Sequence, residues 1–206
     1  MSVEAAEALE RLQAGNRRFA SNQLTLDIND DVRRKLVEGQ APFAIILGCS
    51  DSRVPTEVVF DQGIGDLFVI RIAGNIVQPS QIGSVEFAAQ SFGCRLVVVL
   101  GHTGCGAVEA TIAELNQPTT SQSKNIASIV GRIQPAIESL FDRRAQMTAD
   151  QLMQRAVREN VRYSANALRH GSKIIEMLID DAGLQIVGAE YSLETGVVDF
   201  FDGATS

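Results

Sequence analysis

Four short runs of apolar, mostly β-branched residues constrain the fold of this 206-residue chain more than any other feature. Each run is nearly continuous in hydrophobicity, as expected for strands that are buried on both faces. Segments with helical character, at 80–93, 125–141 and 150–171, lie between them. Strands that alternate with helices predict an α/β fold with a mainly parallel central sheet flanked by helices. The four runs are "FAIILG" (43–48), "LFVIR" (67–71), "LVVVL" (96–100) and "LQIVGAEY" (184–191).

The N-terminal segment is predicted to form an amphipathic helix. Its apolar residues Val3, Ala6, Leu9 and Leu12 recur at roughly helical spacing. Such a face packs either on its own domain or on a partner subunit, and we expect it to pack on a partner.

Composition limits the domain count and the partners. Hydrophobic residues make up 45% of the chain and charged residues 21%, which suits one domain spanning 1–206 with a sizeable core. A net charge of −7 disfavours nucleic acid and anionic membrane surfaces as partners. The first residues lack the apolar block of a signal peptide, and no stretch approaches the roughly 20 apolar residues of a membrane span. We therefore expect a cytoplasmic protein that is not associated with membranes.

Two of the predicted strands run directly into chemically active residues. The first leads into "CSDSRVP" (49–55) and the third into "GHTGCGA" (101–107). Because ligands bind beyond the carboxyl ends of strands in open α/β sheets, these two loops are expected to share one crevice. The residues brought together would be Cys49, Asp51, Arg53, His102 and Cys105.

Two thiols and one imidazole in that crevice indicate a metal site. Three cysteines do not make a disulfide framework, and sulfur with nitrogen ligands favours zinc. Cys105 is expected near the start of a helix, where the helix dipole favours a thiolate. The third cysteine, Cys94, precedes its strand and is expected at the opposite end of the sheet. Three ligands leave a fourth position for water or Asp51, which is typical of a catalytic zinc site.

Together, "CSDSRVP", "GHTGCGA" and the intervening "FDQGIGDLFVIRIAGN" (60–75) resemble the β-class carbonic anhydrases. The resemblance extends over nearly the whole chain. It implies one Zn²⁺ per chain bound by Cys49, His102 and Cys105, and an Asp51–Arg53 pair beside the metal. It also implies a homodimer or a dimer of dimers with active sites at the subunit boundary.

The activity that the resemblance implies is the zinc-dependent, reversible hydration of carbon dioxide to bicarbonate and a proton, with zinc-bound hydroxide as the nucleophile. Asp51 would orient that nucleophile and Arg53 would hold Asp51 away from the metal. In a closed state Asp51 would instead be the fourth metal ligand. The second histidine, His170, follows a long helix and is expected to cap it rather than carry the product proton.

A small apolar pocket suits carbon dioxide, and the residues expected to line it are Gln40, Val54, Phe68, Phe87 and Gly106. Gln40 and Phe68 match the plant-like group of the family, whereas Phe87 stands where that group carries a tyrosine. The other group has a tryptophan in a regulatory bicarbonate site. Ile46 takes that position and the chain has no tryptophan, so we expect that site to be absent.

Two alternatives use the same residues. Carbonyl sulfide and carbon disulfide are also linear molecules that relatives of this family hydrolyse, so the site is compatible with either substrate. A non-catalytic zinc scaffold or bicarbonate-responsive protein would keep Asp51 as a permanent fourth ligand. Arg53 argues against that reading, because a scaffold needs no competing partner for Asp51.

Overall fold

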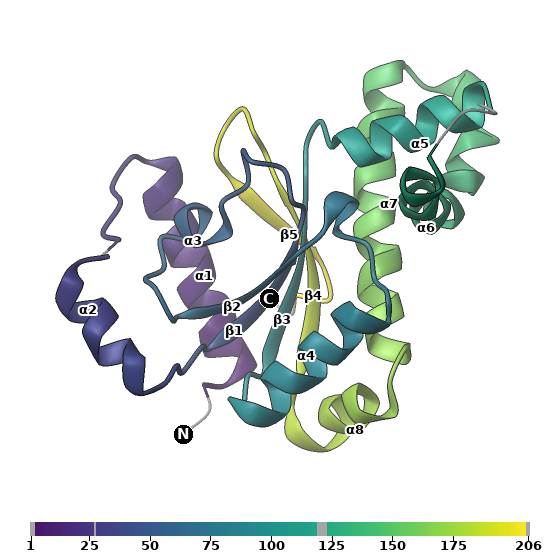
Figure 1. Ribbon diagram of the computed structural model, residues 1–206. Coiled ribbons are helices and arrows are strands. Elements are labelled where there is room, and N and C mark those ends of the chain that lie inside the picture. The colour runs from purple at the N-terminus through teal and green to yellow at the C-terminus, as the bar shows by residue number, and fades with distance from the viewer. Residues whose placement is uncertain (1–2, 27, 119–122, 205–206) are drawn as a thin grey trace.

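The computed structural model describes residues 3–26, 28–118 and 123–204. Its centre is a five-stranded sheet with the strand order β2-β1-β3-β4-β5 (Figure 1). The first four strands are parallel and coincide with the four apolar runs, so the predicted fold class is confirmed. Their bounds are β1 (Ala44–Gly48), β2 (Leu67–Arg71), β3 (Leu96–His102) and β4 (Gln185–Tyr191).

The fifth strand was not predicted from the sequence. β5 (Val198–Asp202) pairs antiparallel with β4 at the edge of the sheet. Its residues, "VDFFD", are mostly half-buried and include two aspartates. An edge strand with one face toward solvent lacks the continuous apolar run that identified the four parallel strands.

Helices cover both faces of the sheet, and alternate strand residues point to each layer. Ile46 and Val98 pack beneath α1 (Ala5–Ala20) and α3 (Thr56–Val59). Ile45 and Val97 pack on the other face, beneath α4, α7 and α8. The bounds of these three helices are α4 (Pro79–Ser91), α7 (Ala149–His170) and α8 (Lys173–Ala182).

The remaining helices lie away from the sheet. α5 (Gly106–Asn116) and α6 (Lys124–Phe141) pack with the first half of α7 beyond the carboxyl ends of the strands (Figure 1). α2 (Asp30–Lys35) stands apart on the other side and buries none of its residues. Short 3₁₀ turns, η1 (Leu36–Glu38), η2 (Ala73–Asn75) and η3 (Arg144–Gln146), complete the described elements. No described helix is long and apolar enough to cross a membrane.

The N-terminal helix forms as predicted, but the expected apolar face was misplaced by one position. Its core-facing residues are Ala5, Ala8, Leu9 and Leu12, and Ala6 is exposed. Steps of three residues drift around a helix of 3.6 residues per turn, so Ala6 falls outside the buried stripe. The stripe packs into the core of its own chain. Docking of α1 on a partner stays a prediction, and it would have to use the outward face.

Candidate metal centre

The two loops singled out in the sequence meet at the carboxyl edge of the sheet. Cys49 directly follows β1, His102 is the last residue of β3, and Cys105 is the N-cap of α5. All three side chains are buried, and their ligand atoms lie within 4.8 Å of one another. Adjacent parallel strands end at the same edge, which brings together residues about fifty positions apart.

The imidazole of His102 is oriented by its own backbone. Nδ1 lies 3.0 Å from the carbonyl oxygen of Thr103. A carbonyl only accepts hydrogen bonds, so Nδ1 carries the proton and Nε2 keeps its lone pair. Within the described residues Nε2 is buried without a hydrogen-bond partner. A buried nitrogen left free within 4.8 Å of two sulfurs is suited to a metal ion.

The two thiols of the centre perturb each other strongly. Cys105 hydrogen-bonds to Cys49, and this contact lowers the pKa of Cys49 although burial opposes the shift. The same contact, together with burial, raises the pKa of Cys105. Cys49 thus loses its proton readily, whereas Cys105 keeps its own. A divalent cation would displace both protons, because metal ligands bind as thiolates.

Asp51 and Arg53 form a two-pronged ion pair beside the cluster. Nε of Arg53 lies 2.9 Å from Oδ1 of Asp51, and Nη2 lies 2.7 Å from Oδ2. The Arg53 guanidinium holds the pKa of the Asp51 carboxyl well below its usual range. The carboxylate is also near the cluster, since Oδ2 is 3.9 Å from Nε2 of His102. Asp51 is therefore ionised and held by Arg53 at the border of the centre.

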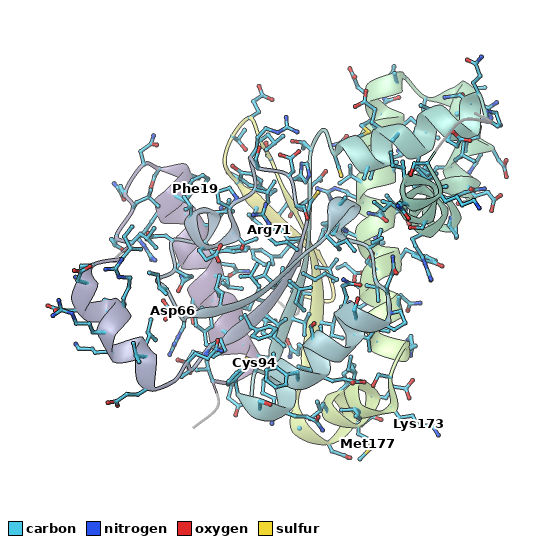
Figure 2. All side chains as sticks on the ribbon, viewed as in Figure 1. Phe19, Asp66, Arg71, Cys94, Lys173 and Met177 are labelled. Atoms are coloured by element: carbon cyan, nitrogen blue, oxygen red, sulfur yellow. The ribbon has the colours of Figure 1, made fainter. Side chains whose placement is uncertain are left out.

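Arg71, at the end of β2, fixes the backbone of this loop. Its Nε donates to the carbonyl oxygen of Cys49 at 3.1 Å, and its Nη2 donates to that of Asp51 at 2.7 Å. Figure 2 shows Arg71 in the upper part of the sheet, far from Cys94. This role of Arg71 was not predicted from the sequence. A charged residue closing an apolar strand was its only signal, and many surface arginines share that pattern.

The predicted pocket residues are dispersed in the single chain. Gly106 is exposed next to Cys105, whereas Val54 is fully buried in the core. Gln40 precedes β1, at the opposite end of that strand from Cys49. Phe68 pairs with Ile45 of β1, roughly 13 Å of strand away from the level of Cys49.

Phe68 and Phe87 belong to an aromatic cluster rather than to a cavity at the centre. Their ring centroids lie 6.1 Å apart, and Phe92 lies 6.0 Å from Phe68 and 5.6 Å from Phe87. A cavity of about 520 Å³ does adjoin the His102–Cys105 loop, but no predicted pocket residue lines it. Its walls are Thr103, Gly104, Asp150, Gln151, Met153, Gln154, Val157 and Glu194. The pocket roles of Gln40, Val54, Phe68, Phe87 and Gly106 stay predictions.

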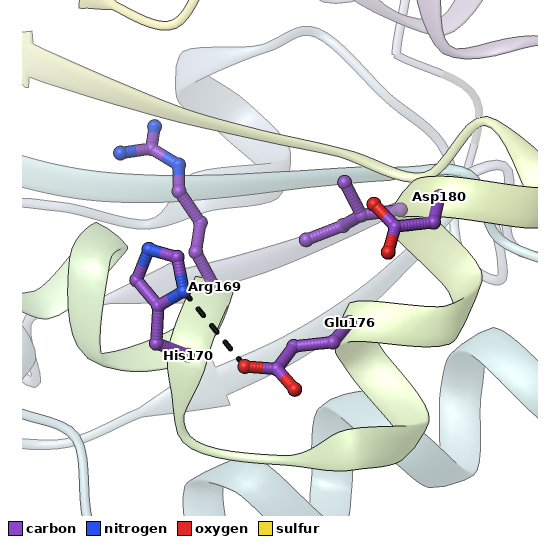
Figure 3. Close-up of a pocket in the computed structure, with 5 residues that line it drawn as sticks. Arg169, His170, Glu176 and Asp180 are labelled. Carbon is purple, nitrogen blue, oxygen red and sulfur yellow. Dashed lines mark ion pairs between the residues drawn. The ribbon is translucent and has the colours of Figure 1, made fainter.

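The remaining cysteine and histidine lie at the other end of the sheet. Cys94 is buried beside the start of β3 (Figure 2), and its Sγ donates to the carbonyl oxygen of Pro42 at 3.1 Å. His170 ends α7 and lines a cavity of about 300 Å³ (Figure 3). Its Nδ1 lies 3.8 Å from a carboxylate oxygen of Glu176. Neither residue contributes to the Cys–His–Cys cluster.

Fold and site together define an α/β protein with a Cys–His–Cys cluster that could hold a metal ion at the carboxyl edge of a parallel sheet. The family model described as carbonic anhydrase matches residues 44–198. The chain is 39% identical to carbonic anhydrase 2 of Mycobacterium tuberculosis over 191 residues, which cover 92% of this chain and 89% of that protein. It is 38% identical to a carbonic anhydrase of Mycolicibacterium smegmatis, over 93% of this chain and 91% of the relative. The chain belongs to the carbonic anhydrase family.

Solved structures of the β class share the fold. A β-carbonic anhydrase of Aspergillus fumigatus aligns with a TM-score of 0.76 at 23% identity, covering 97% of this chain and 91% of that chain. One of two tetrameric β-carbonic anhydrases from Sordaria macrospora aligns with a TM-score of 0.77 at 23% identity, covering 97% of both chains. The resemblance to the β class is confirmed.

Proposed function

We propose that this protein catalyses the reversible hydration of carbon dioxide to bicarbonate and a proton, with one Zn²⁺ per chain. The observation that carries the proposal is the buried cluster of Cys49, His102 and Cys105 beside the Asp51–Arg53 pair. Membership of the carbonic anhydrase family gives that cluster its reaction.

The donor set fits zinc. Two sulfurs and one imidazole nitrogen within 4.8 Å of one another match the soft and borderline ligands that zinc prefers. Nε2 of His102, which has no hydrogen-bond partner among the described residues, would be the nitrogen ligand. A zinc ion held there would act as a Lewis acid that makes water nucleophilic near neutral pH.

The chain's own residues would orient the reaction. The Asp51 carboxylate is ionised and can accept a hydrogen bond from the attacking water, which would direct its lone pair toward carbon dioxide. Arg53 keeps both carboxylate oxygens engaged. Arg71 holds the backbone carbonyl groups of Cys49 and Asp51, so the loop presents the carboxylate in one position.

Asp51 would also provide a closed state. If Arg53 released it, the carboxylate could take the fourth position at the metal and exclude water. In this structure Asp51 is paired with Arg53, which supports the open arrangement over the scaffold in which Asp51 is a permanent ligand.

A second copy of the chain would complete the pocket. Gln40, Phe68 and Phe87 lie away from the cluster in their own chain, and Phe87 is largely exposed. We therefore propose a dimer or a dimer of dimers in which these residues face a neighbouring active site. Tetrameric assembly is stated for the β-carbonic anhydrases of Sordaria macrospora. Free thiol ligands suit a reducing compartment, which supports a cytoplasmic location.

The test is a carbon dioxide hydration assay across pH on protein whose zinc content has been measured. We expect one zinc per chain and an activity that rises into alkaline pH, because two thiolates offset the charge of the cation and weaken it as a Lewis acid. A flat profile from weakly acid to alkaline pH would contradict this account of the ligands. Full zinc content without hydration at any pH would overturn the proposed function, and parallel assays with carbonyl sulfide and carbon disulfide would then identify the alternative substrate.

A further inference from the structure

Asn160 is a buried amide in the middle of α7 that the sequence analysis did not single out. It is 1% exposed, and neighbouring apolar residues of α7, Ala156, Val157 and Val161, are buried on the same side of the helix. Its Nδ2 donates to the carbonyl oxygen of Gly74 at 2.8 Å. An amide is costly in such surroundings unless it is hydrogen-bonded, and this contact offsets part of that cost. Oδ1 of Asn160 is buried without a hydrogen-bond partner among the described residues.

The turn that Asn160 holds reaches the metal centre. The backbone N–H of Gly74 donates to Sγ of Cys49 at 3.4 Å. Gly74 has φ +69°, and a Cβ there would lie 2.8 Å from Ile133 and 3.0 Å from Ala107. The following residue, Asn75, also has a positive φ, +43°. Gly74 adopts this conformation without strain because it has no Cβ, whereas Asn75 does so at a cost, so the turn depends on its surroundings.

The hydrogen bond from Asn160 to Gly74 and the one from Gly74 to Cys49 involve the two peptide groups on either side of the Gly74 α-carbon. Asn160 holds the carbonyl of the peptide that follows Gly74. The N–H of the same peptide, which belongs to Asn75, donates to the carbonyl oxygen of Ile72 at 3.1 Å and closes the turn. With that peptide fixed, the preceding N–H can reach Cys49 only within a narrow range of φ and ψ. The Asn160 amide therefore sets the direction in which the Gly74 N–H points toward the Cys49 sulfur.

A hydrogen bond to a thiolate draws electron density from the sulfur and changes how strongly it donates to a metal. We propose that Asn160 is a positioning residue which, through Gly74, sets the donor strength of the Cys49 sulfur toward the bound metal. The inference rests on the proposed function only in that the cluster binds a metal.

The experiment uses the cobalt-substituted protein, whose sulfur-to-cobalt charge-transfer absorption reports the donor strength of the thiolates. Asn160→Leu keeps the branched outline of the side chain and removes the amide. We expect its charge-transfer band to move to longer wavelength, since a thiolate without the N–H contact gives up electron density more easily. The loss of the contact also leaves the Cys49 side chain less firmly oriented, and for this reason we expect chelators to remove the metal roughly tenfold faster than from the wild type. Ser164→Ala, one turn along α7 and also buried, is the matched control and should change neither quantity.

A second variant and a direct measurement cover the case in which Asn160→Leu does not fold. Asn160→Ser also removes the amide with less disturbance, and it should show the same direction of band shift. In the wild type loaded with ¹¹³Cd, scalar coupling between the metal and the Gly74 amide proton should be detectable across the N–H···S contact. Absence of that coupling would overturn the proposal.

The outcomes separate this role from the proposed function. Variants that bind cobalt with the band and the metal-loss rate of the wild type overturn the positioning role and leave hydration untouched. A shifted band in a protein whose wild type does not hydrate carbon dioxide supports the positioning role and overturns the function. A wild type that takes up no cobalt at the cluster overturns the positioning role together with the metal site.

Discussion

Both ends of the central sheet carry cysteine and histidine, but only one end brings them together. At the carboxyl edge, Cys49, His102 and Cys105 share a space in which their ligand atoms lie within 4.8 Å. At the amino edge, Cys94 is buried in the core and His170 is 68% exposed at the end of α7 (Figures 2 and 3). The carboxyl ends of neighbouring parallel strands converge on one edge, whereas the residues at the amino end enter from separate helices and loops.

The thiols show that burial alone does not set their chemistry. Cys94 and Cys49 are both buried, yet their pKa values shift in opposite directions. Burial raises the pKa of Cys94 to about 11, because the charge of Arg95 and a backbone hydrogen bond offset only part of the loss of solvation. Hydrogen bonds from Cys105 and from further neighbours outweigh the same penalty at Cys49 and lower its pKa. The groups that surround each thiol, rather than how deeply it is buried, therefore decide whether its pKa is lowered, as at Cys49, or raised, as at Cys94.

Replacing one cysteine at each end gives the largest expected difference. Cys49→Ser removes a soft ligand, so we expect loss of zinc and a fall in hydration rate of about a thousandfold or more. Cys94→Ser should keep one zinc per chain and nearly full activity per folded molecule. Elemental analysis and stopped-flow hydration on material checked by circular dichroism measure both. Zinc retained by Cys49→Ser at the wild-type level would contradict the ligand assignment.

Removing the guanidinium of Arg53 tests what the Asp51–Arg53 ion pair contributes to the centre at the carboxyl edge. Arg53→Ala frees Asp51 to approach the metal, and we expect hydration to fall by roughly 10² to 10⁴-fold while zinc stays bound. Arg33→Ala, at an exposed position of helix α2, is the control and should leave the rate unchanged. Full activity in Arg53→Ala would show that Asp51 does not need its partner.

Thiol reactivity tests the amino end. Cys94 in the folded protein should react with a thiol reagent at pH 8 roughly a hundredfold more slowly than the same residue after unfolding, since few of its thiols are ionised at a pKa of about 11. Mass-spectrometric peptide mapping of the zinc-loaded protein follows the rate at each cysteine. Labelling of Cys94 as fast in the folded as in the unfolded protein would mean that this end opens readily.

The histidine at the amino end should have the smallest effect. His170→Ala removes an exposed side chain whose single charged contact, among the described residues, is the pair with Glu176 at 3.8 Å. We expect the free energy of unfolding to change by less than about 0.5 kcal/mol and the hydration rate to change by less than about twofold. The rate should be compared at low and high buffer concentration. A loss confined to low buffer would assign His170 a part in proton release and weaken the contrast between the two ends.

The sequence by itself determined the fold class, the four parallel strands and the cluster at the carboxyl edge. Strand periodicity is local, and the rule that parallel strands end at one edge turns two local motifs into one site. The separate position of Cys94 followed from the same rule, because it precedes the strand that leads into the second motif.

Only the tertiary structure decided which distant groups support the centre. Arg71, Gly74 and Asn160 act through single hydrogen bonds whose partners are set by how the turn at η2 meets α7 and β1, and such contacts leave no periodic trace in a sequence. The packing of α1 on its own chain and the addition of β5 were decided in the same way. Burial and pairing depend on surfaces that exist only once the chain has folded, because local spacing fixes the type of an element but not what covers it.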